Sequence, residues 1–149
     1  MIHEEMIADL IHQAKKEGVQ KIVVGAVIER QEKTVLLLER ASDDFMGGLI
    51  ELPSGTVDEG ETLFEALARE IKEETNLEMT EVVSYLGAFD YLSGSLKKTR
   101  QFSFKVLVKE GNVSLSPEHQ TFLEPFLNSD SFQNANMSPE TRAIILKAC

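Results

Sequence analysis

Three glutamates near the middle of the chain, Glu70, Glu73 and Glu74, have the spacing of a metal-binding group. On a helix each residue turns by about 100°, so carboxylates at positions i, i+3 and i+4 share one sector of the surface. Like charges this close repel each other, and a divalent cation among them removes the repulsion. Oxygen ligands without thiols suit Mg²⁺, with Mn²⁺ as the alternative ion. A solvated acidic helix face is the other interpretation, because most acidic clusters are only that.

Further residues on both sides of these glutamates complete a longer pattern: Gly55, Glu61, Arg69, Ile71 and Leu77. The whole set resembles the signature of the Nudix hydrolases, G-x5-E-x7-R-E-U-x-E-E-x-G-U, in which U is a bulky aliphatic residue. Residues 55–77 match it in register except at Asn76, where the pattern has its second glycine. Asn adopts the left-handed backbone conformation more readily than other non-glycine residues, so the departure suits a helix end and removes no ligand.

The resemblance implies a role for most residues of the pattern. Glu70, Glu73 and Glu74 are expected to ligate the metal, with the carbonyl of Gly55 as a further oxygen. Glu61 is expected to assist through a water molecule or by orienting the site. A metal site of this kind neutralises the dense negative charge of a pyrophosphate and activates a water molecule.

The resemblance leaves the general base open, because the base differs between members of the family. Glu70 is one candidate, and Glu118, in the loop of residues 116–120, is the other. A surface acid beside a proline turn is the alternative for Glu118. Arg69 lies four residues before Glu73, so it either orients the site carboxylates or forms an exposed ion pair worth under about 1 kcal/mol.

Two residues before the signature are candidates for substrate binding. Arg40 is suited to grip a phosphate with two hydrogen bonds, and Phe45 to stack on a base. Phe89 and Tyr91 are further candidates for stacking. Packing in the core or at its rim is the alternative for each of them.

The remaining reactive side chains give weaker signals. His119 is expected to be a surface loop residue and not a catalyst, and His3 and His12 to be structural or exposed. Cys149 is the last residue, where a frayed end would not position a nucleophile.

The helix that carries the glutamates is expected to begin at Thr62, after a loop of residues 54–60. Thr62 and Glu65 have the spacing of a capping box. The buried stripe of this helix is predicted to consist of Phe64, Leu67, Ala68 and Ile71.

Around this helix the sequence alternates between strand and helix patterns. Strands are expected at residues 21–30, 34–40, 49–52, 81–92 and 100–109, and helices at 2–17 and 138–148, while 116–126 is expected to be a loop with some helical turn. This order predicts an α/β (α+β) fold, compatible with a Nudix-like α/β/α sandwich with a mixed sheet. We expect one domain over residues 1–149, with residues 1–18 as an added helix used for packing or for a homodimer contact.

Composition narrows the classes of partner. A net charge of −10 over 149 residues argues against a nucleic acid duplex or an anionic membrane. It does not argue against a small nucleotide, because a bound metal reverses the local field. The single cysteine is typical of a cytoplasmic protein, and no apolar run reaches the length of a membrane span.

The sequence therefore predicts a Mg²⁺-dependent hydrolase of a nucleoside diphosphate linked to another group. A nucleoside triphosphate is the first choice of substrate. ADP-ribose or another nucleotide sugar is the second, although the proline common after the signature in such members is missing, and dinucleoside polyphosphates stay open. The motif of coenzyme A pyrophosphatases is not apparent. A non-catalytic nucleotide-binding module is the alternative of another class, and isopentenyl diphosphate isomerases need an internal cysteine that this chain lacks.

Overall fold

The computed structural model describes residues 4–44 and 46–149. The expectations for Ile2, His3 and Phe45 therefore lie outside the described residues. The elements in chain order are α1 (Glu4–Lys16), β1 (Lys21–Ile28), β2 (Leu37–Arg40), β3 (Ile50–Glu51), β4 (Ser54–Thr56), α2 (Leu63–Thr75), β5 (Met79–Leu92), β6 (Lys98–Val108), β7 (His119–Leu123), α3 (Asp130–Gln133) and α4 (Pro139–Ala148).

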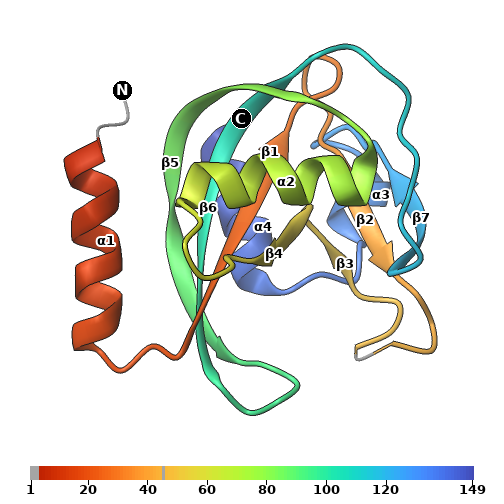
Figure 1. Cartoon of the computed structure of the whole chain (residues 1–149). Helices are drawn as coiled ribbons and strands as arrows, with labels where there is room; N and C mark the ends of the chain where they lie inside the picture. Colours follow the sequence, from red (N-terminus) through yellow and green to blue (C-terminus); the bar gives the residue numbers. More distant parts are fainter. Residues whose placement is uncertain (1–3, 45) are drawn as a thin grey trace.

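The described strands form two sheets (Figure 1). The larger sheet has the order β4-β1-β6-β5, with β1 parallel to β6 and the other neighbours antiparallel. The smaller sheet is antiparallel and has the order β3-β2-β7. Strands β5 and β6 form a long hairpin, and β6 lies beside β1 (Figure 1).

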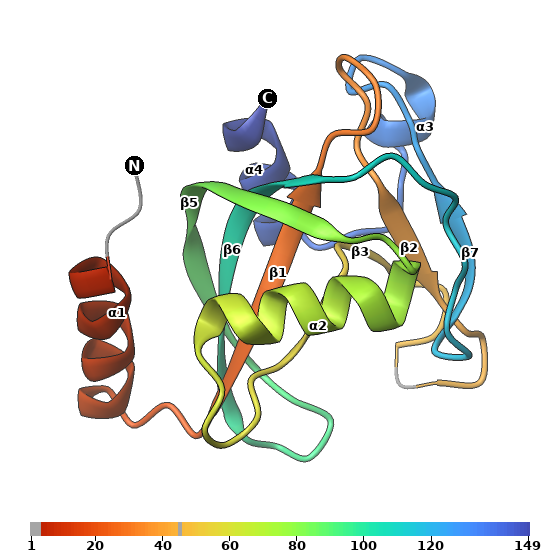
Figure 2. The same cartoon turned by 45° about the horizontal axis from the view of Figure 1, so that its top comes forward.

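Two hydrophobic cores lie on opposite faces of the larger sheet. Along β1, Val24, Ala26 and Ile28 belong to the core that packs under α2, whereas Val27 belongs to the other core, together with residues of α4. Alternate residues of a strand point to opposite faces, so this division follows from the strand period of two. Helix α2 covers one face and α4 the other (Figures 1 and 2), which confirms the predicted α/β sandwich with a mixed sheet.

Helix α2 begins as predicted. The Thr62 side chain accepts a hydrogen bond from the Glu65 N–H, and the Glu65 carboxylate accepts one from the Thr62 N–H, so the capping box is confirmed. Asn76 ends the helix in the left-handed conformation, with φ 65° and ψ 8°. The buried stripe is rotated from the prediction: Leu67 and Ile71 are buried, but Leu63 and Ala66 replace Phe64 and Ala68, which are half-buried.

Three local predictions are wrong. Residues 54–56 form a strand paired with β1 and not a loop, residues 119–123 form strand β7, and the second strand begins at Leu37 and not at residue 34. Both β4 and β7 are short edge strands that have one neighbour. Their pairing is therefore decided by distant segments of the chain and not by a local pattern of apolar residues.

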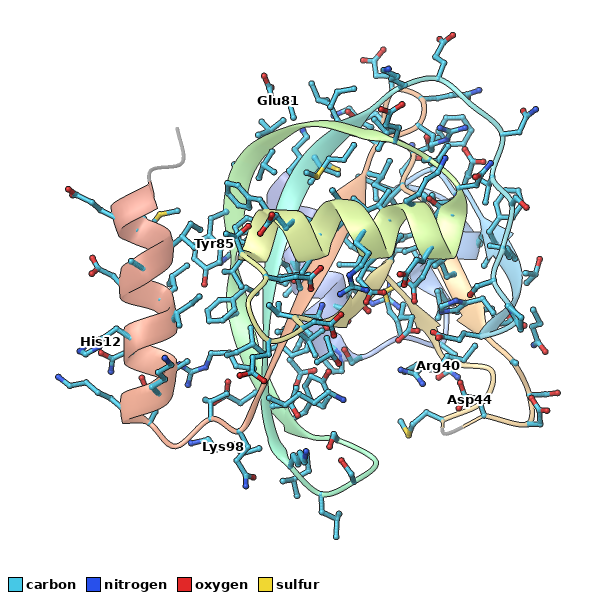
Figure 3. The ribbon with its side chains drawn as sticks, viewed as in Figure 1. His12, Arg40, Asp44, Glu81, Tyr85 and Lys98 are labelled. Carbon is cyan, nitrogen blue, oxygen red and sulfur yellow. The ribbon has the colours of Figure 1, made fainter. Side chains whose placement is uncertain are left out.

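The expected N-terminal helix is present as α1 and stands beside the edge of the larger sheet (Figures 1 and 2). Ile7, Leu10 and Ile11 pack against the core under α2, and Ala14 is fully buried. Tyr85 of β5 lies in the space between α1 and the sheet, while His12 is exposed (Figure 3). None of the helices within the described residues combines the length and the apolar character needed to cross a membrane.

Candidate functional site

A polar cleft of about 310 Å³ lies where β4, the C-terminal half of α2 and the start of β7 meet. Its walls carry both acidic and basic side chains. The lining residues include Lys21, Arg40, Asp44, Glu51, Gly55, Asp58, Glu70, Glu74, Tyr91, Glu118 and His119. The structure thus gathers two signature glutamates, Gly55, Glu118 and Arg40 in one place.

Glu74 is the most buried carboxylate of this cleft, with 4% of its surface exposed. Its Oε1 accepts a hydrogen bond of 2.8 Å from the N–H of Ser54 in β4. Burial raises the pKa of Glu74 to about 9, and the negative charges of Glu70, Glu51 and Glu118 act in the same direction. Without a cation, this position favours the neutral form of the acid.

Glu70 lies one turn earlier on α2 and packs directly on Gly55. A Cβ atom at position 55 would collide with the Glu70 carboxyl group, so only glycine allows this approach. Burial raises the pKa of Glu70, opposed by the hydrogen bond from Arg69. The glycine of the signature therefore makes room for a carboxylate on the facing helix.

Arg69 holds several carboxylates at once. Its Nε and Nη2 donate to the two oxygens of Glu61 at 2.7 and 2.8 Å, and its Nη1 donates to Glu70 at 2.7 Å. Nη2 also donates to the Thr56 carbonyl at 3.0 Å, which ties the arrangement to β4. The hydrogen bond from Arg69 lowers the pKa of Glu61 to about 2. This geometry is more than an ordinary exposed ion pair.

Two residues that were expected to serve the metal site, one as a ligand and one in support, do not line the cleft. Glu73 is exposed and only weakly held by Arg69 Nη1, at 3.3 Å. Glu61 lies behind Arg69 and accepts a backbone hydrogen bond from Asp58 at 2.9 Å. In this arrangement Glu61 supports the site through Arg69 and does not face the cleft.

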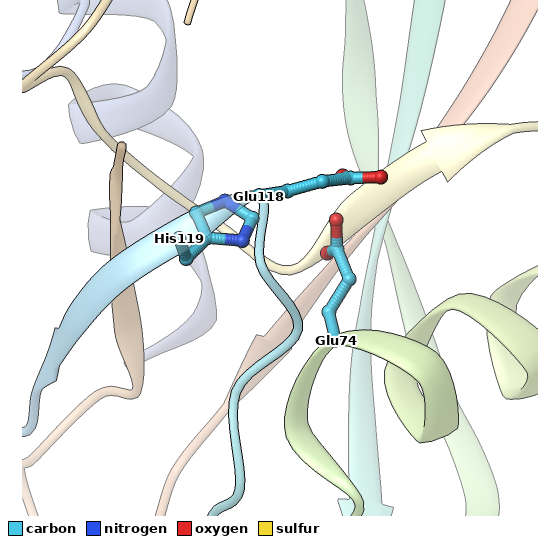
Figure 4. A group of neighbouring side chains, drawn as sticks. All are labelled: Glu74, Glu118 and His119. Atoms are coloured by element: carbon cyan, nitrogen blue, oxygen red, sulfur yellow. The ribbon is translucent and has the colours of Figure 1, made fainter. Parts of the chain in front are cut away.

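The start of β7 supplies the other side of the cleft. Ligand atoms of Glu74, Glu118 and His119 all lie within 4.8 Å of one another (Figure 4). His119 is 5% exposed, so its expected place on the surface is wrong. It is buried because residue 119 pairs with Arg40 of β2 and its ring turns toward Glu51, whose Oε2 lies 2.8 Å from Nε2. No local pattern in residues 116–126 signals this, since it depends on a neighbour nearly eighty residues away.

A second, more apolar cleft of about 290 Å³ adjoins the first and shares Arg40, Glu51, Ser54 and Tyr91 with it. Phe89, next to Tyr91 with ring centroids 6.0 Å apart, also lines it. Arg40 pairs with Glu51 at 3.1 Å. It also pairs with Asp44, which lies beside it in Figure 3, at 3.8 Å. An arginine and an aromatic ring therefore stand at the boundary between a polar and an apolar compartment.

The residues of the polar cleft fit a divalent cation. Burial and mutual repulsion disfavour the charged forms of Glu70 and Glu74, and a cation between such carboxylates would reverse that preference. The oxygen donors suit Mg²⁺ or Mn²⁺. Such a site can bind phosphate oxygens and activate water.

Comparison with known proteins agrees with this geometry. A family model described as NUDIX domain matches residues 19–147. An ADP-ribose pyrophosphatase of Methanocaldococcus jannaschii is 44% identical over 68 residues, which cover 46% of this chain and 38% of that protein. Putative 8-oxo-dGTP diphosphatase 2 of Mycobacterium tuberculosis is 41% identical over 63 residues, which cover 42% of this chain and 43% of that protein. The matched segments thus span less than half the length of either relative.

A solved structure extends the similarity to most of the fold. The crystal structure of MutT protein from Methanosarcina mazei Go1 has a TM-score of 0.75 and 26% sequence identity with this chain. The match covers 89% of this chain and 94% of that one.

Proposed function

The chain belongs to the NUDIX domain family, and from this premise we propose that it is a Mg²⁺-dependent hydrolase that cleaves a pyrophosphate bond in a nucleoside triphosphate. One observation carries the proposal: the carboxylates of Glu70, Glu74 and Glu118 line a polar cleft that adjoins a more apolar cleft lined by Phe89 and Tyr91. A polyphosphate with its metal fits the first compartment and a nucleobase the second.

In the proposed reaction the oxygen of a water molecule bonds to phosphorus while the P–O bond of the anhydride breaks. A triphosphate gives a nucleoside monophosphate, pyrophosphate and a proton. Bound Mg²⁺ would neutralise the negative charge of the phosphates and lower the pKa of a bound water molecule. Glu74 and Glu118 would hold the cation, and the signature adds the Gly55 carbonyl and Glu73 as further proposed ligands, of which Glu73 does not line the cleft here.

Glu70 is the proposed general base. Burial raises the pKa of Glu70, which brings a carboxylate closer to the range in which it accepts a proton efficiently. Arg69 engages Glu70 Oε1 and also grips Glu61, so it positions the carboxylate without blocking its second oxygen. Arg40 is the proposed contact of the substrate phosphates and Tyr91 that of the nucleobase, because both residues line the two clefts.

ADP-ribose is the second candidate substrate, because the M. jannaschii relative is named an ADP-ribose pyrophosphatase. The M. tuberculosis relative, named a diphosphatase of an oxidised nucleoside triphosphate, favours the first candidate. The two substrates differ in their products. ADP-ribose yields AMP and ribose 5-phosphate, whereas a triphosphate yields pyrophosphate.

The test is a product screen with canonical and oxidised nucleoside triphosphates, ADP-ribose, other nucleotide sugars and dinucleoside polyphosphates, each with Mg²⁺. Products are separated by chromatography and pyrophosphate is counted with a coupled pyrophosphatase. We expect pyrophosphate from a triphosphate, and a loss of turnover of at least about 100-fold in Glu70→Gln and Glu74→Gln. Glu81→Gln, on the exposed part of β5 far from the cleft (Figure 3), is the matched control and should keep full activity.

Other outcomes of the same screen have definite meanings. If ADP-ribose is the only substrate that is hydrolysed, with release of AMP, then ADP-ribose and not a nucleoside triphosphate is the substrate. Absence of turnover with every substrate, together with nucleotide-dependent thermal stabilisation, overturns the hydrolase proposal in favour of a nucleotide-binding module.

A further inference from the structure

His119 carries a buried nitrogen that lacks a partner. The residue is 5% exposed, and among the described residues its Nδ1 has no hydrogen-bond partner. An imidazole nitrogen that loses its hydrogen bonds with water destabilises the fold unless something replaces them. Nothing in the signature of residues 55–77 accounts for this side chain.

The other nitrogen of the same ring is firmly held. Nε2 lies 2.8 Å from Oε2 of Glu51, and Oε1 of Glu51 accepts a hydrogen bond of 3.1 Å from Arg40 Nε. Because a carboxylate accepts hydrogen bonds, Nε2 carries the proton and donates it to Glu51. In the neutral ring Nδ1 then presents a lone pair. Histidines that bind metals typically donate their other ring N–H to a carboxylate in this way.

The imidazole that carries this lone pair has two carboxylates near it. One ligand atom each from Glu74, Glu118 and His119 lies within 4.8 Å of the others, and Figure 4 shows the imidazole beside these two side chains. Two independent observations, the close group of ligand atoms and the unpartnered buried nitrogen, thus point to the same place.

We propose that His119 is a nitrogen ligand of the metal centre, acting with Glu74 and Glu118, and that Glu51 orients its ring. The inference rests on the proposed metal site but adds to it a nitrogen donor from outside the signature. Imidazole prefers transition metals to Mg²⁺, whereas carboxylates alone serve Mg²⁺ well. Besides the Mg²⁺ of the proposed reaction, the centre would therefore bind Mn²⁺ or Co²⁺ through a mixed set of nitrogen and oxygen donors.

Pulsed electron paramagnetic resonance on the full chain loaded with Mn²⁺ tests this directly. The chain has three histidines, so a His3→Gln/His12→Gln background leaves His119 as the sole imidazole. We expect a nitrogen hyperfine coupling from a coordinated imidazole in this background, and its loss when His119→Gln is added. Mn²⁺ bound without a nitrogen coupling, or a coupling that persists after His119→Gln, overturns the proposal.

Metal affinity provides a second test that does not depend on turnover. His119→Gln should weaken Co²⁺ binding by at least about 100-fold, measured by titration calorimetry, while Mg²⁺ binding changes by less than about threefold. Glu51→Gln keeps the ligand and loses its orientation, so Co²⁺ binding should fall by about 10-fold to 100-fold and the nitrogen coupling should remain. An equal loss of Mg²⁺ and Co²⁺ binding in His119→Gln would instead assign the histidine a purely structural role.

The metal-binding tests can contradict the histidine ligand without contradicting the proposed function, and the reverse also holds. A chain that hydrolyses nucleotides with Mg²⁺ but shows no nitrogen coupling keeps its function and loses the histidine ligand. A chain that shows the coupling but turns over no nucleotide keeps the ligand and loses the hydrolase.

Discussion

A carboxylic acid buried among other carboxylates is the most unusual residue of this structure. Glu74 is held by one backbone N–H, and burial raises its pKa to about 9. Near neutral pH the metal-free protein therefore keeps a proton on Glu74 that the unfolded chain would release. A cation that replaced this proton would restore the lost stability, so metal binding at the proposed site would be coupled to folding.

Replacing Glu74 with glutamine should stabilise the metal-free protein. A folded pKa of about 9 against the ordinary value of 4.5 gives a contribution that is most favourable below pH 4.5 and is lost as pH rises toward 9. Glutamine mimics the protonated acid and retains an acceptor for the Ser54 N–H. At pH 7 with a chelator we expect Glu74→Gln to raise the free energy of unfolding by roughly 1–3 kcal/mol, measured by denaturant melts.

The same variant should lose its response to metal. Added Mg²⁺ should raise the melting temperature of the unsubstituted protein and leave that of Glu74→Gln almost unchanged, because a ligand charge is gone. Glu65→Gln, on the same helix but outside the cleft, is the control that retains the response to metal. A metal-free Glu74→Gln protein that is less stable than the original would contradict the assigned state of this carboxyl group.

Among single residues, the motif and the resemblance nominated the candidate carboxylates but not their surroundings. Glu70, Glu74 and Glu118 line one cleft, while Glu73 and Glu61 do not line it. The buried place of His119 had no signal in the sequence. Its ring is held by Glu51, and that contact exists only because β7 folds back onto β2.

Among the secondary-structure elements, α2 is the one whose limits depend most on local chemistry. Its first turn is fixed by the reciprocal hydrogen bonds of Thr62 and Glu65, and its end by Asn76. Such caps are readable from sequence because they involve neighbours in the chain. Strands β4 and β7 were missed because they are paired to segments distant in sequence. Prediction therefore succeeded for the helix that carries the glutamates and failed for the edge strands facing it.

The left-handed end of α2 provides a direct test at this scale. At φ 65° an alanine is strained and a glycine is not, so Asn76→Ala should destabilise the protein by about 1 kcal/mol while Asn76→Gly is neutral or stabilising. Asn134 also caps a helix C-terminus, but at φ −97°, where alanine carries no such strain. Asn134→Ala is the matched control in thermal and denaturant melts. An equal loss in the two alanine variants would mean that the left-handed conformation is not what Asn76 supplies.

In the whole molecule, α1 is attached to the family domain by both apolar and ionic contacts. The family match begins at residue 19, after this helix, yet α1 buries apolar side chains against the common core. Arg100 of β6 links the two parts. It pairs with Glu17, just after α1, at 2.9 Å and with Asp90 of β5 at 2.7 Å. The attachment is thus apolar along the helix and ionic at its end.

This ionic link should make the attachment of α1 depend on pH. Hydrogen bonds from Arg100 lower the pKa values of Glu17 and Asp90 below their ordinary values of 4.5 and 3.8. A lowered folded pKa stabilises the fold above the ordinary value, and the contribution is lost as pH falls through the folded one. Hydrogen exchange of the α1 amides should therefore be slow and constant from about pH 7 to 5, after correction for intrinsic rates, and should accelerate progressively below about pH 4.5.

Arg100→Gln should remove this acid-dependent step and give faster exchange at every pH. Lys109→Gln, which breaks an exposed ion pair with Glu78 near the other end of the β6 hairpin, should leave the step intact. If exchange in α1 were equally sensitive to pH with and without Arg100, the helix would be held by its apolar face alone.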